Sequence, residues 1–211
     1  MHNQHMAIHL ANHPLADDLL CTLRDRRTPP ERYRQVARRL TTLLVIEATR
    51  HLPTEATKVQ TPLEQTNGRS LGVGLAAVPV LRAGLGMLEP VLDLFPDVAV
   101  GYVGLERNES TAVAHTYYSK LPSMDGRLVL CLDPMLATGG SACQAIDSIK
   151  ERPSLGVVMV CIIAAPEGLA TVEARHPDVP VYAAALDRGL DKRKYILPGL
   201  GDFGDRLYGT F

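Results

Sequence analysis

The chain has 211 residues and a mass of 22.9 kDa, which predicts one domain or one domain with a small subdomain. Lys and Arg number 22 against 23 Asp and Glu, so the net charge of -1 argues against a nucleic-acid binder held by bulk charge and against an acidic tail. Aromatic residues make up only 5% and Trp is absent, so Leu, Val, Ile and Ala must build most of the core.

No targeting or membrane segment is predicted. Residues 1–10 lack the basic start and apolar stretch of a signal peptide, and the longest mostly apolar run, residues 71–81, is far shorter than the roughly 20 residues of a membrane helix. The cysteines have no CxxC spacing, stand among apolar residues and are interpreted as buried thiols: Cys21, Cys131, Cys143 and Cys161. We therefore expect a cytoplasmic protein with no membrane partner.

The first third of the chain is predicted to be helical. Residues 28–31, TPPE, have the form of a capping box with Pro at the first helical position, and apolar residues at helical spacing then continue to about His51. His5, His9 and His13 are four residues apart and on a helix could hold a metal. The following Pro14 favours the alternative, a strand-like N-terminus without a metal.

From residue 70 onward, short apolar runs alternate with amphipathic stretches. The predicted strands are residues 72–80, 98–105, 127–133, 156–164 and 180–186, and the predicted helices are residues 84–94, 140–151 and 167–176. Near-continuous apolar strands are typical of a sheet covered on both faces, so this order indicates an α/β fold with a doubly wound parallel sheet. In such sheets, ligands bind beyond the carboxyl ends of the strands.

The segment after the third predicted strand carries the clearest chemistry. Asp133 ends the strand, and a loop with two glycines and two hydroxyl residues leads into a helix. Glycines let the backbone approach an anion, helix-start N–H groups point at it, and Thr138 and Ser141 can donate to phosphate oxygens. The Asp133 carboxylate suits ribose hydroxyls, so a sugar phosphate is favoured. The alternative is an ordinary turn in which Thr138 or Ser141 caps the helix.

Residues 132–141, LDPMLATGGS, resemble the 5-phosphoribosyl 1-pyrophosphate (PRPP) loop of the uracil phosphoribosyltransferase family, which are type I phosphoribosyltransferases. The resemblance also covers residues 13–15, 23–25, 47–50, 79–87, 117–122 and 198–206. The last of these segments is the most specific, because other phosphoribosyltransferases share the phosphate loop but lack it.

The resemblance implies a pentosyltransferase of pyrimidine salvage that converts uracil and PRPP to UMP and pyrophosphate. It implies that Asp202 and Arg107 are catalytic. It implies that uracil contacts Ile196, Gly201, Asp202 and Phe203. It implies that PRPP is bound by Arg82, Arg107, Asp133, Pro134, Met135, Leu136, Ala137, Thr138, Gly139, Gly140, Ser141 and Asp202. Mg²⁺ is expected to enter with the donor, with no direct protein ligand, because Mg²⁺ prefers phosphate oxygens and water to an all-protein cage.

Two arginines follow strand ends. Arg82 stands beside Gly84, and its planar guanidinium could donate to a pyrophosphate; a surface arginine in a loop is the alternative. Arg107 opens a polar loop that extends to about Tyr117 and could close over the donor as a lid. A solvated charged loop is the alternative there, and it is favoured by the residues alone.

Residues 195–206 predict a tight, irregular loop, rich in Gly, whose backbone amides and carbonyls could read the edge of a pyrimidine. Cytosine would place an amino group where the O4 atom of uracil accepts, which is a physical basis for excluding it. Phe203 stands where many bacterial family members have Ala, so the shape of the base pocket stays open. A structural C-terminal turn is the alternative.

We expect a single domain over residues 1–211, with a small hood from about residues 1–27 and 187–211. The resemblance further implies a homodimer or homotetramer and makes GTP a candidate effector. Other functions remain open: transfer to a different base, a regulatory protein that binds UMP or PRPP and controls RNA or transcription, and an inactive domain. Near-neutral charge disfavours a nucleic-acid partner. The intact set of Arg82, Asp133, Thr138 and Asp202 disfavours an inactive domain.

Overall fold

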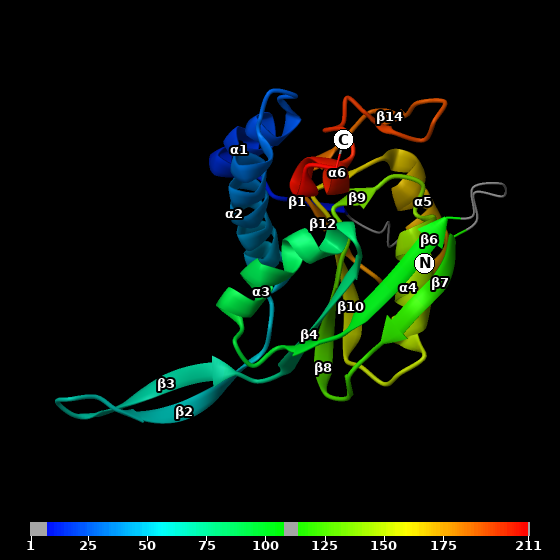
Figure 1. Cartoon of the computed structure of the whole chain (residues 1–211). Helices are drawn as coiled ribbons and strands as arrows, with labels where there is room; N and C mark the ends of the chain where they lie inside the picture. Colours follow the sequence, from blue (N-terminus) through cyan, green and yellow to red (C-terminus); the bar gives the residue numbers. More distant parts are fainter. Residues whose placement is uncertain (1–7, 108–113, 211) are drawn as a thin grey trace, which may run out of the picture.

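A sheet of mostly parallel strands forms the centre of the molecule (Figure 1). The computed structural model describes residues 8–107 and 114–210, without the side chains of residues 106, 107 and 114–116. The strands are β1 (Ile8–Leu10), β4 (Gly74–Leu81), β6 (Tyr102–Arg107), β7 (Ala114–Lys120), β8 (Arg127–Leu132), β10 (Gly156–Val160) and β12 (Val181–Ala183). Their order is β1-β12-β10-β8-β4-β6-β7, and the short β5 (Ala99–Val100) also pairs with β4. This confirms the predicted α/β parallel sheet.

Helices cover both faces of this sheet. On one side lie α1 (Pro14–Arg24), α2 (Pro30–Ala48), the 3₁₀ helix η1 (Ala83–Met87) and α3 (Leu88–Leu94), and on the other lie α4 (Gly140–Lys150) and α5 (Pro166–Arg175) (Figure 1). Successive residues of β8 point to opposite faces, so Leu130 and Leu132 join the first core and Val129 and Cys131 join the second. The sheet is therefore doubly wound, as predicted.

The edge of the sheet differs from the prediction. β7 is antiparallel to β6, although the residues up to Tyr117 were expected to form a polar loop. Polar side chains dominate β7, and an edge strand with one solvated face does not require the apolar run that marks a buried strand. Residues 108–113, which include part of the expected lid, lie outside the described residues.

Two predicted helix boundaries are wrong. The N-cap of α2 is Pro29 and has no side-chain capping bond, so the capping box is not formed; Thr28 Oγ1 instead donates to the Thr22 carbonyl at 2.7 Å. Pro30 is the first helical residue, and the helix ends at Ala48 rather than near His51. The helix expected over residues 84–94 is η1 followed by α3, because Gly84 and Gly86 are poor α-helix formers.

Three of the predicted strands are interrupted, and the breaks position the loops. Residues 156–164 form β10 and β11 (Ile163–Ala164), and residues 180–186 form β12 and β13 (Ala185–Leu186). Residues 98–105 fall in β5 and β6. β11 pairs in parallel with β13 on one side and with β9 (Met135–Leu136) on the other, which forms a second small sheet beyond the end of the main one.

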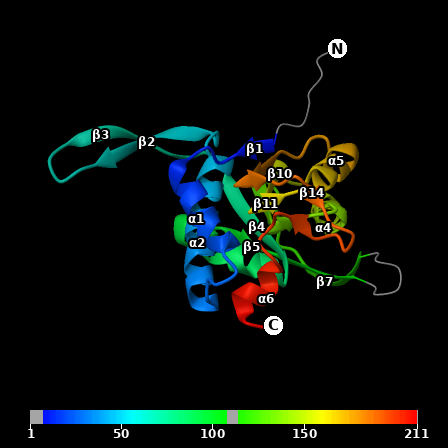
Figure 2. The same cartoon turned by 90° about the horizontal axis from the view of Figure 1, so that it is seen from above.

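A long hairpin of β2 (Thr54–Gln60) and β3 (Gln65–Leu71) projects from the body of the protein in both views (Figures 1 and 2). Sequence patterns do not predict it, because its residues are mostly polar and both faces are exposed. Two strands alone are marginally stable in water. In this hairpin, the apolar side chains of Val59, Leu63 and Leu71 are exposed and are not covered by the described part of this chain.

The N-terminal histidines have structural roles. Ile8–Leu10 is a strand, as the alternative to a metal-binding helix predicted, and the ring of His9 stacks on Tyr182 at 4.5 Å between centroids. His13 Nδ1 accepts from the Leu15 N–H at 3.0 Å at the start of α1. His5 lies outside the described residues.

The cysteines follow the prediction with one exception. Cys131, Cys143 and Cys161 are buried, but Cys21 is exposed on α1 because it lies on the face of the helix away from the core. Among the described helices, none is both long enough and apolar enough to cross a membrane.

Candidate functional site

A cavity of about 190 Å³ lies at the carboxyl ends of β4 and β8. It brings together most of the residues expected to bind PRPP, in agreement with the position of ligand sites in such sheets. Its lining comprises Val80, Leu81, Arg82, Ala83, Leu105, Asp133, Met135, Leu136, Ala137, Thr138, Gly139, Ser141 and Ala142. Pro134 and Gly140 do not line it. The Pro134 carbonyl accepts from the N–H groups of Ile162 and Ile163, so this residue fixes the loop from behind.

The loop between β8 and α4 is shaped by Gly139. Gly139 is the N-cap of α4 and has a φ of +81°, and a Cβ there would lie 2.7 Å from the Gly168 carbonyl oxygen. The cap has no side-chain hydrogen bond, so the alternative in which Thr138 or Ser141 caps the helix is wrong. Neither hydroxyl has a hydrogen bond to a described residue, and the first N–H groups of a helix lack intrahelical acceptors. These donors suit an anion.

Arg82 lines the same cavity, after the end of β4. It is exposed and follows a cis peptide bond between Leu81 and Arg82. The next turn packs closely on the end of β8, since a Cβ on Gly84 would lie 2.3 Å from the Leu132 carbonyl oxygen. Arg107 ends β6, but its side chain lies outside the described residues, and so do Asn108 to Ser110.

A second cavity, of about 430 Å³, adjoins the first and contains every residue expected to bind uracil. Ile196, Gly201, Asp202 and Phe203 line it together with Gly204 and the basic and aromatic tip of the hairpin of β14 (Gly189–Leu190) and β15 (Ile196–Leu197), namely Arg193, Lys194 and Tyr195. Ala83, Met135 and Ala137 line both cavities. The two cavities therefore share a wall of small or flexible side chains.

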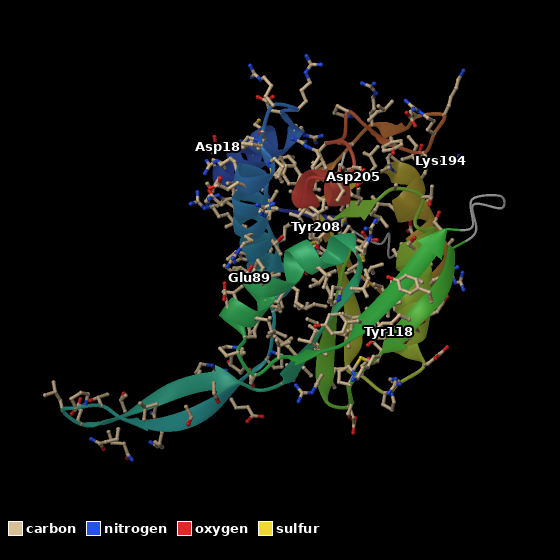
Figure 3. All side chains as sticks on the ribbon, viewed as in Figure 1. Asp18, Glu89, Tyr118, Lys194, Asp205 and Tyr208 are labelled. Carbon is tan, nitrogen blue, oxygen red and sulfur yellow. The ribbon has the colours of Figure 1, made fainter. Side chains whose placement is uncertain are left out.

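The residues expected to contact uracil or PRPP leave out five that line the second cavity: Ala83, Arg193, Lys194, Tyr195 and Gly204. Arg193 and Lys194 directly precede the expected base loop of residues 195–206, and the signal for them is this pair of cations beside Tyr195, the first residue of that loop. Figure 3 shows Lys194 at the same end of the molecule as Asp205 of α6 (Phe203–Tyr208). The hairpin tip is fixed by Asp191 Oδ1, which accepts from the N–H groups of Arg193 and Tyr195 at 2.8 and 2.9 Å. Ala83 gave no signal in the sequence.

The Phe203 side chain points into the core. It is 1% exposed, its ring meets Tyr33 edge-on at 5.4 Å between centroids, and a Cβ on Gly86 would lie 3.2 Å from its ring. The neighbouring Asp202 is exposed, and its Oδ1 caps α6 by accepting from the Asp205 N–H at 2.9 Å. The bulk of Phe203 is thus absorbed by the core.

Arg206 anchors the base loop to the N-terminal segment. The guanidinium is buried over the Tyr33 ring, 4.4 Å from its centroid, and donates to the carbonyls of Leu200 at 2.7 Å, Asp25 at 2.6 Å and Leu23. Burial raises the pKa of the Tyr33 hydroxyl above its ordinary value. This contact joins two segments that are about 180 residues apart in the sequence.

The buried thiols are unsuited to catalysis. Burial raises the pKa of Cys131 and Cys161 well above the ordinary value of a thiol, and the nearby Asp133 carboxylate acts in the same direction. Neutral thiols are poor nucleophiles, so these residues pack the core beside the site.

A family model described as uracil phosphoribosyltransferase matches residues 10–210. The chain belongs to the uracil phosphoribosyltransferase family. A curated uracil phosphoribosyltransferase of Latilactobacillus sakei is 48% identical over 201 residues, which cover 94% of this chain and 96% of that protein. Another, of Shouchella clausii, is 45% identical over 205 residues, which cover 96% and 98%. The family and the pentosyltransferase class expected from the sequence are confirmed.

Solved structures agree with this assignment to the uracil phosphoribosyltransferase family. A protein from Aquifex aeolicus superposes with a TM-score of 0.91 at 40% identity, covering 96% of this chain and 98% of that chain. Orotate phosphoribosyltransferase of Mycobacterium tuberculosis reaches a TM-score of 0.51 at 13% identity, covering 87% and 96%, which shows a shared fold. The type I phosphoribosyltransferase fold is therefore confirmed.

Proposed function

We propose that this chain transfers the 5-phosphoribosyl group of PRPP to uracil and releases UMP and pyrophosphate. The observation that carries the proposal is the pair of adjoining cavities, one built from the phosphate-type loop and one from residues 193–204. A donor in the first cavity and a planar base in the second would meet across the shared wall of Ala83, Met135 and Ala137.

In the first cavity, the residues are proposed to divide the donor between them. The N–H groups at the start of α4, with the hydroxyls of Thr138 and Ser141, bind the 5′-phosphate. The Asp133 carboxylate accepts from the ribose hydroxyls. Arg82 and Arg107 stabilise the departing pyrophosphate, because an arginine fork donates to two phosphate oxygens at once.

The reaction breaks the bond between the anomeric carbon and the pyrophosphate oxygen and forms a bond from that carbon to N1 of uracil. The carbon gains positive charge as pyrophosphate leaves, so catalysis consists mainly of positioning and charge stabilisation. Asp202 and Arg107 are the residues proposed to act on the reacting groups, with Asp202 in the second cavity near the base.

The residues fit a Mg²⁺ ion that arrives with the donor. No group of three His, Cys, Asp or Glu side chains among the described residues could form a cage, and Asp133 is the carboxylate in the lining of the first cavity. Mg²⁺ keeps several waters and favours phosphate oxygens, so pyrophosphate can supply most of its ligands. When bound, the ion would neutralise charge on the leaving pyrophosphate.

Uracil is favoured over other bases by the backbone character of the base loop. Gly201 and Asp202 can present main-chain N–H and C=O groups to the polar edge of the base, and an edge with the opposite pattern would leave buried groups unpaired. The Phe203 ring packs into the core, so only its backbone is available to the base.

The deciding experiment incubates purified protein with radiolabelled uracil, PRPP and Mg²⁺ and measures UMP. Formation of UMP is expected, and folded protein without turnover under several conditions would contradict the proposal. Cytosine, hypoxanthine and guanine are each tested as the acceptor base in place of uracil. Product from a purine and none from uracil would favour transfer to another base.

Asp202 is tested by three variants. Asp202→Ala is expected to lower kcat strongly, and Asp202→Asn is expected to do so while still capping α6 through its amide oxygen. Asp205→Asn, in the first turn of the same helix, serves as the matched control and should retain most of the activity. Parent rates in Asp202→Asn would contradict a role for the carboxylate charge.

We also propose that residues up to about 27 and from 187 onward form a hood over the site. In support, Arg24 binds Asp187, and Arg206 binds the carbonyls at the end of α1. The chain is further proposed to be cytoplasmic, where its free thiols would stay reduced. GTP is proposed as an effector, and calorimetric titration of GTP into the protein tests this.

A homodimer or homotetramer is proposed as the working state, supported by the β2–β3 hairpin. Its exposed Val59, Leu63 and Leu71 would be covered by a second copy. Light scattering of the intact chain is expected to give a multiple of 22.9 kDa. Replacement of residues 56–69 by a short Gly-Ser linker is expected to lower that mass, and an unchanged mass would place the contact elsewhere.

A further inference from the structure

Outside both cavities, one buried ion pair holds the backbone of the base loop. Asp187 follows β13, and its side chain is 4% exposed. Its Oδ1 accepts from Arg24 Nη2 at 2.6 Å and its Oδ2 from Arg24 Nη1 at 2.9 Å, so the arginine fork matches the carboxylate. The Asp187 N–H donates to the Ala164 carbonyl at 2.8 Å, which attaches the acid to β11.

The same ion pair binds both main-chain polar groups of Gly199. The Gly199 N–H donates to Asp187 Oδ2 at 2.9 Å, and its carbonyl accepts from Arg24 Nη1 at 2.8 Å. The three residues thus form a closed set of charge-assisted hydrogen bonds, which are stronger than neutral ones. Loss of either side chain would leave a buried main-chain group of Gly199 without its partner.

Gly199 in turn fixes the residues that line the second cavity. Its φ is +65°, and a Cβ would lie 2.1 Å from the Ile196 carbonyl oxygen, so the turn is closed tightly on Ile196. Ile196 stands three residues before it and Gly201 two residues after it, and both line the second cavity. Neither Arg24 nor Asp187 is among the described residues that line either cavity.

We propose that Arg24 and Asp187 are positioning residues for base recognition, acting through Gly199 on Ile196 and Gly201. This inference rests on the proposed function, because it takes the second cavity as the uracil site. The side-chain hydrogen bonds of the ion pair are directed to Gly199 and not to the donor loop of residues 133–141, so loosening the pair should weaken binding of the base and leave binding of PRPP intact.

The test compares Arg24→Met and Asp187→Asn with a matched control, Arg34→Met, in the full-length protein. Arg34 also reaches from an N-terminal helix to the C-terminal segment, where its Nη1 donates to the Leu207 carbonyl at 2.8 Å, but it lines neither cavity. In steady-state kinetics, one substrate is varied while the other is kept at saturation, which gives separate KM values for uracil and PRPP. Neither KM value depends on the fraction of the protein that is folded.

Arg24→Met and Asp187→Asn are each expected to raise the KM for uracil about 10- to 100-fold, the range for a lost hydrogen bond to a charged group. The KM for PRPP should change less than about 2-fold, and Arg34→Met should leave both values near those of the parent. Where either variant fails to fold, Arg24→Lys keeps the charge without the fork and should raise the KM for uracil about 10-fold. Methylguanidine added to the Arg24→Ala variant should replace the missing guanidinium and lower the raised KM for uracil of that variant.

Two results would overturn the positioning role: an unchanged KM for uracil in an active, folded Arg24 variant, or equal increases in both KM values, which would mean a general structural effect. A parent protein that makes no UMP would overturn the proposed function itself. The two failures are therefore distinguishable in one set of assays.

Discussion

The ring of Phe203 packs edge-on against the ring of Tyr33 at 5.4 Å between centroids, so a residue of the base loop is anchored on α2. Both side chains are almost completely buried. Phe203→Ala is expected to lower the free energy of unfolding by about 3–5 kcal/mol, the range for removing a buried phenyl ring. Chemical denaturation measures this, and Tyr118→Ala, at an exposed ring, is the control.

Tyr33 itself carries a cost. Its hydroxyl is buried and has no hydrogen-bond partner among the described residues. An unsatisfied buried polar group costs about 1–3 kcal/mol, so Tyr33→Phe is expected to stabilise the protein by about 1 kcal/mol and to raise its Tm. A lower Tm would mean that the hydroxyl has a partner, such as a bound water.

Thr138→Val tests the phosphate loop with a side chain of nearly the same shape. Removal of the hydroxyl is expected to raise the KM for PRPP about 10- to 100-fold, because hydrogen bonds to charged groups are worth about 1.5–3 kcal/mol. The KM for uracil should stay near the parent value, since Thr138 lines only the first of the two cavities. Equal changes in both constants would contradict the assignment of this loop to the donor.

Gly84→Ala is expected to be severely destabilising. The added Cβ would lie 2.3 Å from the Leu132 carbonyl oxygen, a main-chain atom of the central strand that cannot move away cheaply. Gly140→Ala is the matched control for stability, because its nearest neighbour would be Thr138 Oγ1 at 3.8 Å. Thermal unfolding of the two variants should differ clearly, with Gly140→Ala close to the parent.

The cysteines predict how stability changes at high pH. Burial raises the pKa of the Cys131 and Cys161 thiols, so above about pH 8.5 the unfolded chain loses thiol protons that the folded protein retains. The free energy of unfolding is therefore expected to fall as the pH rises above that value, and the free energy of unfolding of Cys161→Ala should fall less steeply.

In native protein, a thiol reagent should react with Cys21 and spare the three buried cysteines.

Much of the site was predictable because its chemistry follows strand ends. The loop from Asp133 to Ser141 combines an apolar strand, glycines and a helix start, and local sequence is enough to recognise that pattern. The base loop was recognisable from its glycines and from family resemblance. The contacts that fix these loops in place were not predictable, because Arg24 reaches Asp187, and Arg206 reaches the Leu23 carbonyl, only in the folded chain.

The errors in the fold have a common physical origin. The hairpin of β2 and β3 and the edge strand β7 are solvated on at least one face, so burial does not impose an apolar pattern on them. The capping box at residues 28–31 failed because the Thr28 hydroxyl found a carbonyl in the preceding segment. In each case, tertiary contacts or solvent outweighed the local signal.

The small sheet of β9, β11 and β13 gives the enzyme a modular construction. β9 is part of the donor loop, β13 leads into Asp187 and the base loop, and both are hydrogen-bonded to β11. The two substrate-facing loops thus leave a common frame and share no segment of chain. Changes confined to residues 193–195 would therefore alter the acceptor cavity while keeping Gly199, Asp202, Phe203 and the donor loop unchanged.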